Sequence, residues 1–157
     1  MINGVPGSGK SRLAARLAAA LDVPWVELDA LYHGPDWTPV DRRVFEAQVR
    51  AVADGAAWVI DGNYGAVREI VRARAELIVA IDLPRPLVMV QLVSRTLRRM
   101  VTGEELWNGN REELRNLLST DPDRNLLLWA HRHFATYRGR AKADELASRA
   151  GGQKAVG

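Results

Sequence analysis

The run Gly4-Val5-Pro6-Gly7-Ser8-Gly9-Lys10-Ser11 constrains this chain more than any other segment. It fits G-x-x-x-x-G-K-[ST] at every fixed position, which is the pattern of a phosphate-binding P-loop. Glycines let successive backbone N–H groups turn toward one phosphate, and the lysine adds a mobile positive charge. A chance glycine loop is the alternative, but an apolar helical pattern over residues 13–21 follows at once. We expect the phosphates of ATP to bind Gly4, Gly7, Ser8, Gly9, Lys10, Ser11 and Arg12.

Length and composition agree with a small enzyme. A chain of 157 residues predicts one domain over 1–157, and the absence of cysteine excludes a disulfide framework or a cysteine metal site. We find no signal peptide and no apolar stretch that could span a bilayer, so we expect a cytoplasmic protein without a membrane partner. The net charge of +3 is mild, and without alternating aromatic and basic residues we expect no nucleic-acid partner. The oligomeric state stays open.

Strand and helix patterns alternate along the chain. This alternation behind a P-loop predicts an α/β fold, a three-layer P-loop NTPase sandwich with a parallel sheet between helices. The active site is then expected beyond the carboxyl ends of the strands. The predicted strands are Met1–Asn3, Trp25–Leu28, Trp58–Ile60 and Leu77–Ile81. The predicted helices are Ser11–Leu21, Asp41–Asp54, Val67–Arg74, Pro86–Met100, Arg111–Leu118 and Asn125–Tyr137.

Acidic residues follow two of these strands. Asp61 has the form of a Walker B acid, which would hold Mg²⁺ together with the Ser11 hydroxyl. The alternative for Asp61 is a turn aspartate, because Asp-Gly is a common turn pair. Asp29 either orients or deprotonates an acceptor hydroxyl, or it caps the segment after it. His33 is a weaker acid–base candidate, since a loop histidine is usually solvated.

An arginine-rich helix end forms the second informative region. Arg95 and Arg99 lie one helical turn apart, and a Gly/Asn-rich loop leads on to Arg111. This arrangement resembles a lid, over about residues 100–111, that closes on ATP. Arginine suits that role because its planar guanidinium grips phosphate oxygens and stays charged. The alternative is a solvated basic face paired with Glu104 and Glu105.

Taken together, these motifs resemble the small P-loop kinases of the adenylate kinase and shikimate kinase type. The closest likeness is to the adenylate-kinase-like proteins often labelled DNA topology modulation proteins. The likeness runs from the P-loop to about Trp129, and it implies a parallel sheet, an acceptor-binding segment at about 30–55 and a lid. It implies a reaction type and no particular substrate. The segments that carry it are Gly4–Ser11, Glu27–Pro39, Trp58–Tyr64, Ile81–Arg85, Arg95–Arg99 and Glu105–Glu112.

The chain departs from that family at both ends. Only Met1–Asn3 precede the P-loop, so we expect a clipped first strand. Residues 141–157 are polar and Ala/Gly-rich without a β-branched run, so we expect the last strand to be missing. In the family that strand helps to wall the adenine pocket, and its loss would weaken base binding.

The sequence thus predicts transfer of the γ-phosphoryl group of Mg·ATP to a small acceptor, either a nucleotide or a hydroxyl compound. Lys10 would hold the phosphates, Asp29 would face the acceptor, and Arg99 would neutralise charge as the phosphoryl group moves. Arg95 and Arg111 would assist in binding ATP. The alternative from another class is a nucleotide-binding regulatory module with little turnover, which would act on DNA as the label of the similar family suggests.

Overall fold

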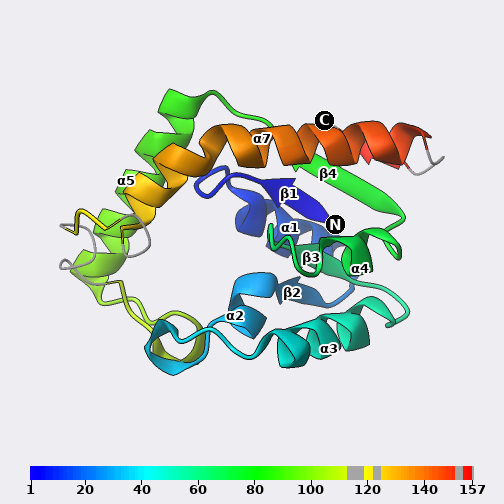
Figure 1. Ribbon diagram of the computed structural model, residues 1–157, viewed down its shortest axis with the longest axis horizontal. Helices are drawn as coiled ribbons and strands as arrows, with labels where there is room; N and C mark the ends of the chain where they lie inside the picture. The colour runs from blue at the N-terminus through cyan, green and yellow to red at the C-terminus, as the bar shows by residue number, and fades with distance from the viewer. Residues whose placement is uncertain (113–118, 122–124, 151–153, 157) are drawn as a thin grey trace.

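A parallel sheet forms the centre of the computed structural model, which describes residues 1–112, 119–121, 125–150 and 154–156 (Figure 1). Within these residues the sheet has five strands in the order β2-β3-β1-β4-β5. Every pairing between neighbouring strands is parallel. The strands are β1 (Ile2–Gly4), β2 (Trp25–Glu27), β3 (Val59–Asp61), β4 (Leu77–Ile81) and β5 (Lys154–Val156).

Helices connect the strands and cover the sheet. None of the described helices is both long enough and apolar enough to cross a membrane. The α-helices are α1 (Lys10–Leu21), α2 (Leu28–Tyr32), α3 (Arg42–Ala53), α4 (Arg68–Arg72), α5 (Arg85–Thr102) and α7 (Leu126–Ala150). Two short 3₁₀ turns, η1 (Pro35–Trp37) and η2 (Trp107–Gly109), lie in the loops after α2 and α5.

The two faces of the sheet bury separate apolar clusters. Val59 on β3 packs with Ala14 and Ala18 of α1. Its neighbour Ile60 belongs to a different cluster, with Phe45 of α3 and residues of α4. Because successive strand side chains point to opposite faces, α1 covers one face and α3 and α4 cover the other. The expected α/β architecture, with a parallel sheet between helices, is therefore confirmed.

The carboxyl ends of three strands meet at one edge of the sheet. Gly4 ends β1, and the chain passes from it through the P-loop directly into α1. Glu27 ends β2 and lies opposite Asp61, the last residue of β3, in the parallel register. Neighbouring strands thus carry the P-loop and two carboxylates to the same place, where open α/β sheets bind their ligands.

The first difference from the sequence prediction lies after β2. We expected a strand over Trp25–Leu28 ending at Asp29, but α2 begins at Leu28, so Asp29 lies in the first turn of a helix. Leu28 is 2% exposed and belongs to the cluster around Phe45 and Val49. Burial of Leu28 beneath α3 accounts for the earlier turn out of the sheet.

Both ends of the chain also differ from the expectation. β1 is short, with 3 residues, yet it pairs with β3 on one side and β4 on the other. The expected loss of the last strand is wrong, because Lys154–Val156 pairs with β4 as β5. The final predicted helix, Asn125–Tyr137, also continues to Ala150, since residues 141–150 are rich in the helix formers Ala, Leu, Glu, Lys and Arg. The helix predicted over Arg111–Leu118 falls mainly on residues outside the described ranges.

We predict that Gly62→Ala lowers the free energy of unfolding by about 1–3 kcal/mol. Gly62 has φ of 139°, and an added Cβ would lie 2.6 Å from Cβ of the buried Leu28. Urea denaturation measures the change. Gly65→Ala is the matched control, because its Cβ would lie 3.9 Å from the nearest heavy atom, Nη1 of Arg140. Equal losses in the two variants would contradict this account of the turn after β3.

Candidate functional site

The glycine-rich loop that was predicted to bind phosphate leads directly into the first turn of α1. Gly9 is the N-cap of α1, with φ of 85° in the left-handed region, and an added Cβ there would have no heavy atom within 4 Å. The helix has no side-chain cap at this end and no acidic residue in its first turn. Its first N–H groups have no acceptor within the helix. Unpaired N–H groups at the start of a helix are a common place for a phosphate to bind.

The other side of the P-loop packs tightly against the fold. An added Cβ at Gly7 would lie 2.8 Å from the backbone oxygen of Val88 and 3.0 Å from Cβ of Leu92. Both neighbours belong to α5, whose far end carries the predicted lid arginines. The side-chain amide of Asn63 donates to the backbone oxygen of Gly4. The loop is therefore supported on one side by α5 and on another by Asn63, which follows β3.

The structure brings together the two predicted magnesium ligands. The Ser11 side chain lies beside the Asp61 carboxylate. Asp61 is 2% exposed, and its Oδ2 has no hydrogen-bond partner among the described residues. Burial raises the pKa of Asp61, whereas the nearby Ser11 side chain and the charge of Lys10 lower it. This hydroxyl and this orphaned carboxylate oxygen fit a magnesium ion that takes its other ligands from water and phosphate.

Glu27 is a site residue that the sequence reasoning missed. It lies opposite Asp61 in the strand register, and the Trp107 side chain lies near it in the same cleft. Burial raises the pKa of Glu27, and the nearby Asp61 raises it further. The signal was available in principle, because Glu27 is a polar residue at the end of a strand.

No group of three or more His, Asp or Glu side chains in the described part of the chain could by itself hold a metal.

Asp29 lies in the first turn of α2. The Tyr64 hydroxyl donates to Oδ1 of Asp29 at 2.6 Å and lies 3.3 Å from Nε2 of His33. α2 has no side-chain cap, so the observed contact of the Asp29 carboxylate is with Tyr64. The structure therefore gathers Asp29 and His33 around a tyrosine that the sequence reasoning did not assign to the site.

A cleft separates the start of α1 from the lid. Its volume is about 390 Å³, in the range of small-molecule sites. It brings P-loop residues together with the lid arginine Arg99, although the two segments are far apart in sequence. Its lining residues are Ser11, Arg12, Ala15, Trp25, Glu27, Arg99, Glu104, Glu105, Leu106 and Trp107.

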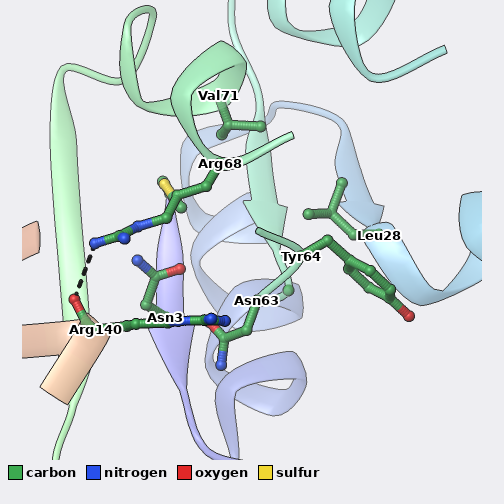
Figure 2. A pocket seen from close by; sticks show the side chains of 9 residues that line it. Asn3, Leu28, Asn63, Tyr64, Arg68, Val71 and Arg140 are labelled. Carbon is green, nitrogen blue, oxygen red and sulfur yellow. Dashed lines mark hydrogen bonds between the residues drawn. The ribbon is translucent and has the colours of Figure 1, made fainter. Parts of the chain in front are cut away.

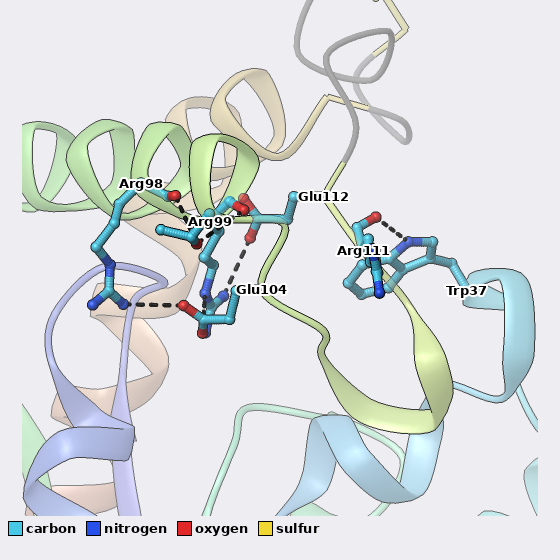
Figure 3. A network of polar contacts seen from close by, with 7 residues as sticks. Trp37, Arg98, Arg99, Glu104, Arg111 and Glu112 are labelled. Atoms are coloured by element: carbon cyan, nitrogen blue, oxygen red, sulfur yellow. Dashed lines mark hydrogen bonds and ion pairs between the residues drawn. The ribbon is translucent and has the colours of Figure 1, made fainter.

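The lid arginines differ in how they are held (Figure 3). Arg99 has a side chain 16% exposed and forms ion pairs with Glu104 and Glu112, each at 3.2 Å. Arg98 is 66% exposed and shares Glu104 at 3.3 Å. Arg111 lies outside the cleft, where its backbone oxygen accepts a bond from the Trp37 indole at 3.2 Å. The pairing that the alternative predicted is present, because Glu104 pairs with Arg98 and Arg99, and Glu105 pairs with Arg111 at 3.5 Å. Arg99 departs from a solvated face, since its side chain is only 16% exposed.

Arg95, one helical turn before Arg99, is half-buried. Its Nε is buried and has no hydrogen-bond partner among the described residues. Burial lowers the pKa of Arg95 and the like charge of Arg99 lowers it further, while Glu112 and Asp29 oppose the shift. A half-buried guanidinium with an unused donor would favour an incoming anionic group.

A buried asparagine joins the predicted lid to the predicted acceptor-binding segment. Asn110 is 4% exposed, and its Oδ1 accepts the backbone N–H of Trp37 at 2.8 Å. Its amide nitrogen donates to the backbone oxygens of Gly34 at 2.9 Å and Trp107 at 2.8 Å. The rings of Trp37 and Trp107 also meet edge to face, with centroids 6.3 Å apart. The two segments thus form one docked unit, which the sequence reasoning did not predict.

A second, small cavity lies behind Tyr64 (Figure 2). Its volume is about 20 Å³, enough for roughly one water molecule. Arg68 closes one side by donating to the backbone oxygen of Arg140 at 3.1 Å. This cavity is too small for an acceptor, so substrates would have to use the larger cleft and the surface beside Asp29.

No protein-family model and no curated protein matches this chain. The functional assignment therefore depends on the residues and the geometry described above. What these establish is a parallel α/β fold with a glycine-rich loop, two carboxylates and an arginine cluster around one edge of the sheet.

We predict that Asn110→Ala releases the lid from the acceptor-binding segment. Three hydrogen bonds of a buried side chain are lost, so exchange of the Trp37 backbone N–H should accelerate roughly tenfold or more. Hydrogen exchange followed by NMR measures this rate. Thr102→Ala is the control, because that exposed hydroxyl bonds only within its own helix, to the backbone oxygens of Arg98 and Arg99. Unchanged protection of Trp37 in Asn110→Ala would contradict the docking role.

Proposed function

We propose that this protein is a phosphotransferase that moves the γ-phosphoryl group of Mg·ATP to a small acceptor. The observation that carries this proposal is the juxtaposition of the glycine-rich loop at the start of α1 with the neighbouring side chains of Ser11 and Asp61. A glycine turn alone would bind many anions. A hydroxyl and a buried carboxylate beside it fit a nucleotide that arrives with Mg²⁺.

Each residue then has a defined role. The N–H groups at the start of α1, with Lys10 and the nearby Arg12, hold the phosphates. Ser11 and Asp61 hold Mg²⁺, which neutralises phosphate charge when it is bound. Binding by backbone N–H groups fixes the phosphates before reaction, so little reorganisation is needed as charge moves.

On the acceptor side, Asp29 accepts the proton of the attacking hydroxyl. The acceptor oxygen forms a bond to the γ-phosphorus, the bond to the β–γ bridging oxygen breaks, and ADP leaves with that oxygen. Arg95 and Arg99 neutralise the charge on the moving phosphoryl group, and Arg111 anchors the lid through its backbone contact with Trp37. Lid docking excludes water that would otherwise hydrolyse ATP.

A nucleotide-binding regulatory module with little turnover is the second candidate. One observation favours it, because Glu104 and Glu112 both pair with Arg99 and so occupy the charge that a kinase would use. In the kinase account these carboxylates release Arg99 when phosphate arrives. In the module account they keep it neutralised.

Formation of ADP from ATP, with and without a panel of nucleotides, nucleosides and small alcohols, separates the two. The kinase account predicts turnover that depends strongly on one class of acceptor. Binding of Mg·ATP without turnover in the presence of any acceptor would favour the regulatory module. Absence of Mg·ATP binding would contradict both candidates.

We predict that Arg99→Ala lowers acceptor-dependent turnover by about 10²-fold, the effect of losing one charge contact in the transition state. Affinity for Mg·ATP should fall much less, because the contact forms after closure. Arg98→Ala is the matched control on the same helix, since its side chain is 66% exposed and shares the same Glu104. Equal and small effects in the two variants would mean that the arginines have no part in transfer.

A further inference from the structure

Three polar side chains from two segments meet beside the acceptor-binding region. Asp29 lies in the first turn of α2, His33 is the C-cap residue of the same helix, and Tyr64 follows β3. The Tyr64 hydroxyl is 2.6 Å from Oδ1 of Asp29 and 3.3 Å from Nε2 of His33. A single hydroxyl thus connects a carboxylate to an imidazole.

The Tyr64 ring is fixed on both sides by aromatic packing. It lies 4.5 Å from the ring of Tyr32 and 5.2 Å, edge to face, from that of Phe45, measured between centroids. Phe45 is itself 1% exposed within the core. Burial and the neighbouring Asp29 raise the pKa of Tyr64 well above its usual range. The hydroxyl therefore stays protonated and acts as a donor to the carboxylate.

His33 is also held in place by rings. Trp37 meets it edge to face with centroids 5.3 Å apart, and Trp107 of the lid lies nearly parallel to it, at 17° and 6.3 Å. Tyr32 contacts a further edge at 5.0 Å. Its Nδ1 is buried without a hydrogen-bond partner among the described residues, so Nε2 provides its link to Tyr64.

We propose that Tyr64 is a positioning residue that holds the Asp29 carboxylate toward the acceptor hydroxyl and couples it to His33. This inference rests on the proposed phosphotransferase function, in which Asp29 accepts the acceptor proton. Without the hydroxyl of Tyr64, the carboxylate loses its short bond and can rotate about its side-chain torsions. Turnover then falls while the phosphate site, on the other side of the strand ends, keeps its affinity for ATP.

Tyr64→Phe tests the proposal, because it keeps the packed ring and removes only the hydroxyl. We expect its acceptor-dependent kcat to fall about tenfold or more, with unchanged affinity for Mg·ATP. Tyr32→Phe is the matched control, since it removes a hydroxyl from the ring packed against Tyr64 and should leave kcat unchanged. Thermal unfolding of both variants checks that the fold is intact. Equal kcat in Tyr64→Phe and the wild type would overturn the proposal.

A second readout needs no acceptor. Burial lowers the pKa of His33, and the charge of Asp29 opposes that shift. NMR titration of the His33 imidazole, assigned with His33→Gln, should show a lower pKa in Tyr64→Phe and in Asp29→Asn, because each breaks the connection to the carboxylate. An unchanged His33 titration in Tyr64→Phe would overturn the coupling. If the wild type shows this coupling but no turnover with any acceptor, the proposed function fails while the hydrogen-bonded arrangement stands.

Discussion

The contact between Ser11 and Asp61 is the one on which the site depends. It joins the first turn of α1 to the end of β3, and α1 packs against β3 through Ala14, Ala18 and Val59. A buried carboxylate is costly unless hydrogen bonds and positive charge compensate it. Ser11 and Lys10 supply part of that compensation, and Oδ2 remains unused among the described residues. The fold thus maintains an incompletely satisfied carboxylate beside an open anion site, which is a sign of binding rather than of stability.

The second constraint is the docking of the lid against the acceptor-binding segment. Asn110 uses its side chain to join Trp37 and Gly34 to the loop after α5. Arg99 precedes this loop, and His33 precedes Gly34. Because Asn110 joins the two segments, a movement of one segment would displace the other. Acceptor binding and lid closure would then be one event, and a water molecule would rarely meet an exposed phosphate.

The local elements were largely predictable, whereas the contacts between distant segments were not. The apolar run Leu77–Ile81 forms β4 with the predicted bounds, and the P-loop leads into a helix as its glycines indicate. The early start of α2 at Leu28 depends on packing against Phe45, far along the chain. Tyr64 and Asn110 owe their places in the site to partners 35 or more residues away, which no local pattern reveals. β5 pairs with β4 through backbone hydrogen bonds, so the residue composition of this segment did not indicate a strand.

Isothermal titration of Mg·ATP into the wild type and into Lys10→Ala tests the central claim most directly. The phosphate-binding account predicts that the wild type binds Mg·ATP and that adenosine, which lacks phosphates, binds far more weakly. It also predicts that Lys10→Ala loses most of the Mg·ATP affinity while keeping the wild-type unfolding temperature, because Lys10 at the open loop supports no core packing. Equal affinity of the two proteins for Mg·ATP, or equal binding of Mg·ATP and adenosine, would contradict the account.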